Sequence, residues 1–376
     1  MKVVVGLAEL LAFPLMGCGH FRIGSNDFAA LPRKFAGRGG GEGTGAGDFD
    51  GVASPAMLDR APPEPPSPHP PRLTGWRGAW NALRNFGLVS LGSPASGDYD
   101  SFTASDGQVV PVYVLGGGPP LVLVHGVGCS HRDWMPVARR LARHHCVLAW
   151  DARGHGNCRP VRGSITLARL ATDLAEMLDH FGLQRSVLVG HSMGALTLMQ
   201  YLQLHGTRRV KAVALVDQSP RIVTDDNWRL GLFGGCSAAM LSGLIAGARQ
   251  DLAETLLNEV GALGGAWLRH QLGVDASLGR MLRRRLGSID LRPLLDLAES
   301  MAQADFRVSL SRLDAPLLVV LGARSPHYAG LPLDAWYRDT VKHAQVSVYP
   351  SAGHSPHVSE PLRFVRELER FLDDHA

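Results

Sequence analysis

Residues 186–195 read SVLVGHSMGA, and this stretch decides the fold of the 376-residue chain. A valine-rich run leads into G-x-S-x-G, and the apolar residues at 195–202 favour a helix after it. This pattern is typical of a nucleophile elbow, in which the serine sits on a sharp turn between a strand and a helix. Side chains at Gly190 or Gly194 would collide with that turn. The sequence therefore predicts Ser192 on a strained turn that the surrounding sheet holds in place.

Three further motifs occur in a fixed order along the chain. A short apolar run ends in His-Gly at 125–126, a second ends in Asp151 and continues as ARGHG, and Gly-His at 353–354 precedes Glu-Pro at 360–361. Together with the elbow, this set resembles the α/β-hydrolase superfamily, in its esterase and haloperoxidase-like branch. The resemblance covers roughly residues 99–376.

Strand-like and helix-like segments alternate over this region. Such alternation implies an α/β fold with a mostly parallel sheet and helices on both faces. The catalytic residues should then lie at the carboxyl ends of the strands. We expect strands near 99–103, 109–115, 121–125, 146–150, 186–189, 212–216, 317–321 and 346–349, and helices over 132–144, 165–181, 333–341 and from 361.

About 100 residues between Val216 and Leu317 interrupt the alternation. They contain apolar residues at helical spacing but no convincing central strand. A structureless loop of that length is unusual in a compact domain. The resemblance implies an inserted helical cap, at about 219–304, over the active site.

The first 75 residues differ in composition from the rest. Residues 37–47 are rich in glycine, and residues 61–71 include seven prolines. Such segments bury too little apolar surface to offset chain entropy. We therefore expect a disordered extension over 1–75 and a hydrolase domain over 76–376. Cys18 ends a weakly lipoprotein-like leader, but Glu9 within its apolar run counts against export. A cytoplasmic location is favoured, with export or lipid anchoring through Cys18 as the alternative.

Composition and charge argue against several other classes of protein. The net charge of +4 is thinly spread, and the basic run 280–285 is interpreted as a solvated helix face, so no nucleic-acid partner is expected. Five cysteines without C-x-x-C spacing argue against a disulfide framework and a zinc site. We expect no cofactor, no bound metal and no membrane span, and the oligomeric state stays open.

The chemistry expected at the elbow needs a base and an oxyanion site. Ser192 requires a base within hydrogen-bond reach, and the Gly-His pattern selects His354 over the nearby His357. The resemblance implies that the backbone N–H groups of Met193 and Val127 receive the negative charge of the tetrahedral intermediate. His125, His155 and His191 are interpreted as structural.

The acid of the triad is the uncertain member. Many relatives place an aspartate after the seventh strand, where this chain has Ser325. A serine could accept a hydrogen bond from the histidine, but it supplies no negative charge. Asp217 directly follows the sixth strand and keeps the order Ser–acid–His. Asp217 is therefore the favoured acid, and the alternative is that it anchors the entrance of the cap.

These residues predict a serine hydrolase that cleaves a carboxylic ester, thioester or lactone through an acyl-serine intermediate. The expected partner is a small-molecule acyl ester. Two alternatives stay open, an acyltransferase on the same scaffold and a non-catalytic protein that senses ligands.

Overall fold

The computed structural model describes residues 98–251, 253–255, 257–258, 270, 273, 276–277, 279–280, 283–284 and 292–375. The expected extension over 1–75, including Cys18, lies outside the described residues. Part of the expected cap lies outside them too.

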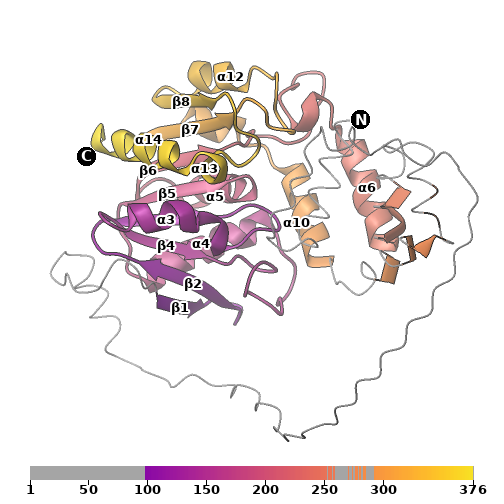
Figure 1. Cartoon of the computed structure of the whole chain (residues 1–376), viewed down its shortest axis with the longest axis horizontal. Helices are drawn as coiled ribbons and strands as arrows, with labels where there is room; N and C mark the ends of the chain where they lie inside the picture. Colours follow the sequence, from indigo (N-terminus) through magenta and orange to yellow (C-terminus); the bar gives the residue numbers. More distant parts are fainter. Residues whose placement is uncertain are drawn as a thin grey trace, which may run out of the picture. The chain divides into compact units, whose positions relative to one another are not determined.

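An eight-stranded sheet forms the centre of the described structure (Figure 1). The strand order is β1-β2-β4-β3-β5-β6-β7-β8. The β1–β2 and β2–β4 pairs are antiparallel, and every other pair is parallel. The strands are β1 (Asp98–Thr103), β2 (Val109–Leu115), β3 (Pro120–Val124), β4 (Cys146–Trp150), β5 (Ser186–His191), β6 (Val210–Val216), β7 (Leu317–Gly322) and β8 (Ala344–Tyr349). This architecture confirms the fold class expected from the sequence.

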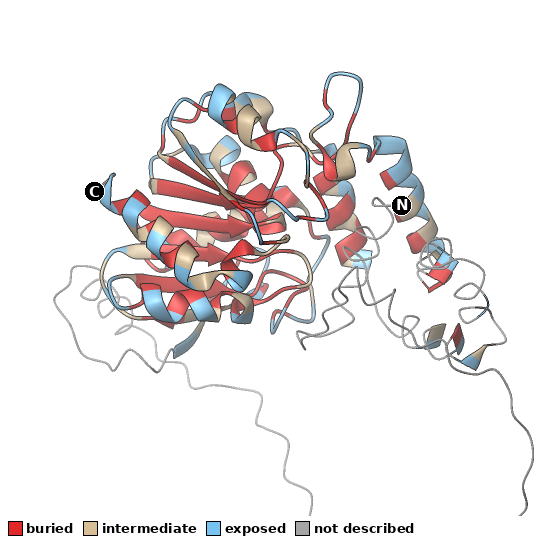
Figure 2. Cartoon of the chain, turned by 45° about the horizontal axis from the view of Figure 1, so that its top comes forward, coloured by how far each residue is buried: buried red, intermediate tan, exposed pale blue. Residues whose placement is uncertain are grey.

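Helices cover both faces of the sheet because its central strands are apolar on both sides. In β3, Val122 and Val124 join one hydrophobic cluster, and Leu121 and Leu123 join another. The alternation follows the two-residue period of a strand. The first cluster includes residues of α4 (Leu167–His180), α5 (Met193–His205) and α12 (Leu333–Thr340), and the second includes residues of α3 (Met135–Leu141) and α14 (Pro361–Asp373). Figure 2 shows the resulting buried sheet between partly exposed helices.

One expected helix is divided in the structure. The segment 132–144 begins as a 3-10 turn, η3 (His131–Trp134), and continues as α3, which ends at Leu141. Ser130 and Asp133 form a capping box that starts the turn. Pro136 lies in the first turn of α3, where the N–H that proline lacks would have no helical partner.

The described part of the segment between β6 and β7 is helical. It contains the 3-10 turn η4 (Leu232–Gly234) and the helices α6 (Ala238–Gln250), α10 (Arg292–Gln303) and α11 (Arg307–Ser311). Helix α10 packs against α6 and against α4. This helical content agrees with an inserted cap, and the boundaries 219–304 stay a prediction.

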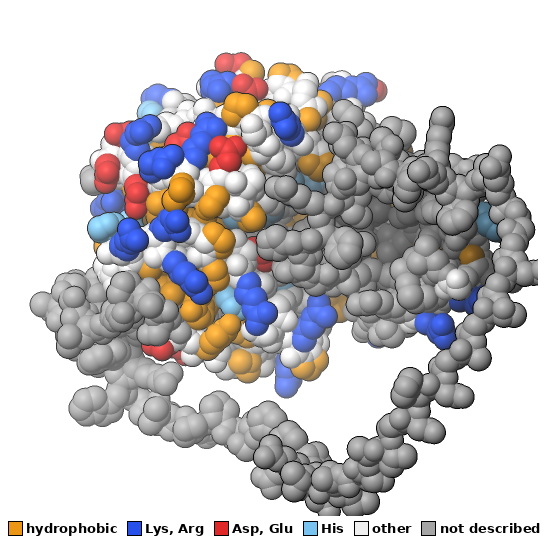
Figure 3. Space-filling view, viewed as in Figure 1, with side chains coloured by type: hydrophobic (Ala, Val, Ile, Leu, Met, Phe, Trp, Pro, Cys, Tyr) orange, Lys and Arg blue, Asp and Glu red, His pale blue; other side chains and the backbone are white. Residues whose placement is uncertain are grey.

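The described surface carries mixed charge. On the face shown in Figure 3, Lys and Arg side chains are interspersed with acidic and apolar ones. No helix in the described part of the chain is both long and apolar enough to span a membrane.

A buried ion pair joins α4 to the segment that follows β4. The guanidinium of Arg153 donates to both oxygens of Asp173, at 2.5 and 2.7 Å, and both side chains are buried. Arg153 also donates to Asp106 in the turn between β1 and β2. Residue 153 belongs to the ARGHG motif, so the motif ties the hairpin to a helix.

We predict that Asp173→Asn lowers the free energy of unfolding by about 3 kcal/mol, because it removes the buried carboxylate and leaves the buried guanidinium of Arg153 with only the partly exposed Asp106 as a counter-charge. The matched control on the same helix is Asp179→Asn. Asp179 pairs with Arg209 but its side chain is 61% exposed, so this change should cost under about 0.5 kcal/mol. Urea denaturation followed by circular dichroism measures both values. Equal costs for the two variants would contradict the prediction.

Candidate active site

Ser192 lies on the turn between β5 and α5. Its backbone has φ 53° and ψ −119°, a conformation that L-residues rarely adopt. The Ser192 N–H donates to the carbonyl oxygen of Val216 at the end of β6, at 3.1 Å. A Cβ at Gly194 would lie 2.1 Å from the carbonyl oxygen of Val124, so α5 approaches β3 too closely for any side chain there. The expected strand–turn–helix geometry is present.

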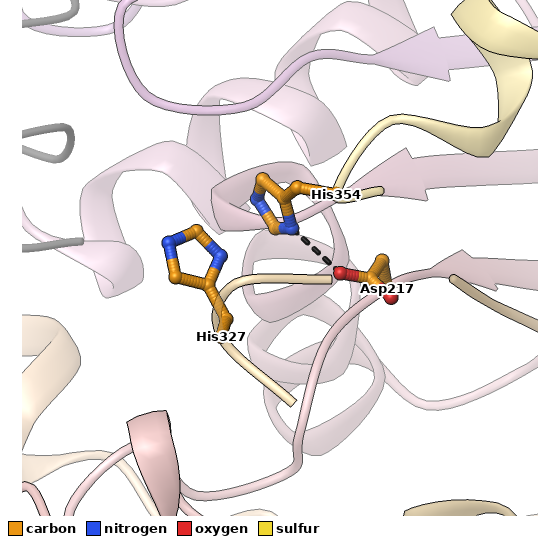
Figure 4. A group of neighbouring side chains, drawn as sticks. All are labelled: Asp217, His327 and His354. Atoms are coloured by element: carbon orange, nitrogen blue, oxygen red, sulfur yellow. Dashed lines mark hydrogen bonds and ion pairs between the residues drawn. The ribbon is translucent and has the colours of Figure 1, made fainter. Parts of the chain in front are cut away.

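Asp217 and His354 come together at the same edge of the sheet, although 137 residues separate them. Asp217 directly follows β6, and His354 follows β8. The Nδ1 atom of His354 lies 2.7 Å from Oδ2 of Asp217 (Figure 4). The carboxylate is fully buried, whereas the imidazole is 21% exposed. The structure therefore joins the predicted base to the favoured acid.

Ser325 occupies a different position in this network from the one considered from sequence. Its hydroxyl donates to Oδ2 of Asp217 at 2.6 Å, and the Gly322 N–H donates to Oδ1 at 2.8 Å. The residue is a donor to the carboxylate, while the Nδ1 hydrogen bond of His354 goes to Asp217. The last residue of β7 and the loop after it thus supply hydrogen bonds in place of an acid.

Burial acts on both members of the Asp217–His354 pair. It raises the pKa of Asp217 to about 6, although the hydrogen bonds from Ser325 and Gly322 act in the opposite direction. Burial also lowers the pKa of His354 to about 4. At neutral pH, therefore, Asp217 is ionised and His354 is neutral. The Nδ1–H then donates to the carboxylate, and Nε2 is left as the acceptor that a general base requires.

The loop after β3 lies beside the elbow. A Cβ at Gly126 would lie 3.2 Å from the Cβ of Ser192. His125 holds this loop, because Nε2 accepts from the Ala152 N–H at 3.0 Å and Nδ1 donates to the carbonyl oxygen of Gly126 at 2.8 Å. Val127 follows Gly126 in this loop, and Met193 is the first residue of α5. Both residues thus lie in segments that flank Ser192, and their role as oxyanion donors stays a prediction.

His191 and His155 contact backbone groups. The Nε2–H of His191 donates to the carbonyl oxygen of His354 at 2.8 Å and so ties the histidine loop to the elbow. Nδ1 of His155 lies 2.8 Å from the carbonyl oxygen of Arg153. Their contacts agree with a structural interpretation.

Sequence reasoning missed His327 as a neighbour of the site. Its ring lies 4.1 Å from the ring of His354, nearly perpendicular to it (86°), and only 6% of the residue is exposed (Figure 4). Neither ring nitrogen has a hydrogen-bond partner in the described residues. Burial lowers the pKa of His327, so the ring is neutral. The sequence feature that could have indicated it is its position two residues after Ser325, in the loop that follows the seventh strand.

Asp217, His327 and His354 offer ligand atoms within 4.8 Å of one another. Two imidazoles and a carboxylate are a donor set that Zn²⁺ accepts. In the present geometry, however, Oδ2 of Asp217 and Nδ1 of His354 already share a hydrogen bond. The arrangement seen here is a hydrogen-bonded pair of His354 and Asp217 with His327 beside it.

Comparison with known proteins identifies the family. The sequence model of the alpha/beta hydrolase family matches residues 121–367. This chain belongs to that family. A pimeloyl-[acyl-carrier protein] methyl ester esterase from Chromobacterium violaceum is 32% identical over 271 residues, which cover 70% of this chain and 98% of the relative. A 3-oxoadipate enol-lactonase from Acinetobacter baylyi is 22% identical and covers 72% of this chain and 95% of its own length.

Solved structures of family members have the same fold. An esterase from Exiguobacterium antarcticum matches with a TM-score of 0.58 at 19% identity, over 73% of this chain and 98% of the esterase. An esterase from a Rhodococcus species matches with a TM-score of 0.54 at 28% identity, over 74% and 99% of the two chains. The similarity to esterases supports an ester-hydrolysing enzyme.

We predict that Gly194→Ala lowers the free energy of unfolding by about 2 kcal/mol or more, because its methyl group meets the backbone of β3. Gly243→Ala is the matched control within α6. Nothing lies within 4 Å of a Cβ at position 243, so this change should stabilise the protein by about 0.5–1 kcal/mol through helix propensity. Chemical denaturation of both variants checks the opposite signs, and a neutral Gly194→Ala would show that the contact with β3 relaxes freely.

Proposed function

We propose that this protein hydrolyses carboxylic esters through an acyl intermediate on Ser192. The observation that carries the proposal is the Asp217–His354 hydrogen bond at the elbow edge of the sheet. The hydrogen bond from the His191 side chain to the carbonyl oxygen of His354 supports the proposal, because residue 191 directly precedes Ser192. A hydroxyl, an imidazole and a buried carboxylate in this order form the constellation that acyl transfer requires.

In the first half of the reaction, Oγ of Ser192 attacks the ester carbonyl carbon. Its proton passes to Nε2 of His354, which is the free acceptor of the neutral ring. The oxyanion of the tetrahedral intermediate takes hydrogen bonds from the N–H groups of Met193 and Val127. His354 then gives its proton to the leaving alkoxide, and the acyl-serine is left.

In the second half, water attacks the acyl-serine with His354 again as the base. Asp217 stabilises the imidazolium that forms in both halves and holds the ring in the tautomer with Nδ1–H. Ser325 and Gly322 keep the buried carboxylate ionised by donating to it. The two named relatives act on a methyl ester and an enol lactone, and this supports ester or lactone substrates here.

We predict that a fluorophosphonate probe labels Ser192, because such probes react with activated serine nucleophiles. Ser192→Ala should abolish the labelling and should lower kcat on p-nitrophenyl esters by roughly 10³-fold or more. Mass spectrometry of the labelled peptide and a series of increasing acyl length measure both effects. Labelling that persisted on another serine would reject the assignment. An added alcohol that captures most of the acyl group would indicate an acyltransferase.

We predict different effects for the two residues that meet at the carboxylate. Asp217→Asn should lower kcat by around 10⁴-fold, because the charge beside His354 is lost. Ser325→Ala should lower kcat by no more than roughly 10- to 100-fold, because it removes one hydrogen bond to the charged carboxylate, worth about 1.5–3 kcal/mol, and leaves the charge itself in place.

The pH profile supplies a second readout. In the parent enzyme, kcat should fall as the pH drops through about 6, where Asp217 takes up a proton. The Ser325 hydrogen bond lowers the pKa of Asp217, so Ser325→Ala should move this acid limb to higher pH. Asp226→Asn, a change at a fully exposed carboxylate, is the control. Near-normal turnover in folded Asp217→Asn would reject Asp217 as the acid.

A further inference from the structure

A hydroxyl, an imidazole and a carboxylate that are joined by hydrogen bonds lie outside the candidate active site. The hydroxyl of Tyr99, in β1, lies 2.9 Å from Nε2 of His131. Nδ1 of His131 lies 2.9 Å from Oδ1 of Asp151, which directly follows β4. The mechanism above uses none of these three residues. Their order reproduces the linkage of a nucleophile to a base and of the base to an acid.

The direction of the hydrogen bonds among these three residues follows from the charge of Asp151. Burial alone would raise its pKa, but hydrogen bonds from the side chain and backbone of His131 and from the backbone of Asn157 hold it down at about 2. An ionised carboxylate only accepts, so Nδ1 of His131 donates to it. In the neutral ring, Nε2 is then the acceptor, and the Tyr99 hydroxyl donates.

Solvent exposure differs sharply among these three residues. Tyr99 is 57% exposed, while His131 and Asp151 are buried. The ring of His131 is further held by edge-on contact with the ring of Tyr99, at 5.4 Å and 89°. An oriented and buried base therefore contacts the hydroxyl of a residue that is itself largely exposed.

We propose that Tyr99 is a second nucleophile, an acylation site for acyl donors with a good leaving group, with His131 as its base. The phenolic oxygen forms a bond to the carbonyl carbon of the donor, and its proton passes to Nε2 of His131. The bond from the carbonyl carbon to the leaving group breaks, and that group departs with the bonding electrons. The product is an aryl ester at Tyr99, and the proton on His131 is released to water.

The base accounts for the expected reactivity. An ordinary tyrosine is almost fully protonated at neutral pH, with a pKa of about 10. A positioned general base accelerates such proton transfer by about 10²–10⁴-fold. Tyr113 provides an internal comparison, because its ring lies 5.0 Å from that of Tyr99 but the Nε2 hydrogen bond of His131 goes to Tyr99. Tyr113 is also less exposed than Tyr99, so the role of the base is tested separately by changing His131.

The test uses the full chain carrying Ser192→Ala, so that its outcome is independent of the proposed esterase function. The protein is treated with p-nitrophenyl acetate, and acetylated tyrosines are located and timed by peptide mass spectrometry. Tyr99 should be acetylated at least about tenfold faster than Tyr113. Equal rates at the two tyrosines, or no acetylation of Tyr99, would overturn the proposal.

His131→Asn tests the base directly. An asparagine amide reaches the position of Nδ1 and keeps a donor for Asp151, but it has no atom at the position of Nε2. Acetylation of Tyr99 should slow by about tenfold or more, and an unchanged rate in the folded variant would overturn the proposal. If this variant does not fold, the rate at Tyr99 in the parent background is compared with that of free N-acetyl-tyrosinamide under the same conditions, and a rate at Tyr99 no faster than that of the free phenol would overturn the proposal.

Discussion

The carboxylate of Asp217 is the group on which the arrangement of the candidate site depends. A buried charge is costly unless hydrogen bonds compensate it, so the surrounding loops must deliver donors to it. His354 and Ser325 donate to one oxygen and Gly322 to the other. Because these donors come from the loops after β7 and β8, one buried charge holds both loops at the end of β6.

Strained backbone conformations at the ends of two neighbouring strands orient the side chains of Ser192 and Asp217. Ser192 after β5 and Asp217 after β6 both have positive φ, at 53° and 50°. Each also donates its N–H to the end of the next strand, to Val216 and Val320 respectively. Such conformations persist only where the surrounding structure over-determines them. The central parallel strands supply that constraint and turn the serine and the carboxylate toward the same edge of the sheet.

The same physics explains the contrast between the two imidazole–carboxylate pairs, His354–Asp217 and His131–Asp151. At the elbow, the carboxylate is buried and strongly desolvated, and its pKa is raised. At Asp151, backbone and side-chain donors outweigh the cost of burial, and the pKa is lowered. The first pair lies next to the Ser192 turn, and the second contacts Tyr99 in the edge strand β1.

The sequence by itself determined the local elements and the elbow. Periodicity and glycine placement act over a few residues, so the strands, most helix positions and the turn at Ser192 could be predicted. The choice of Asp217 rested on its position after a strand, and the tertiary structure decided the partners. The donor role of Ser325, the place of His327 beside His354, and the link from Tyr99 through His131 to Asp151 could not be read from the chain. These contacts join residues that are distant in sequence, and only the register of the sheet and the paths of its loops bring their atoms within hydrogen-bond reach.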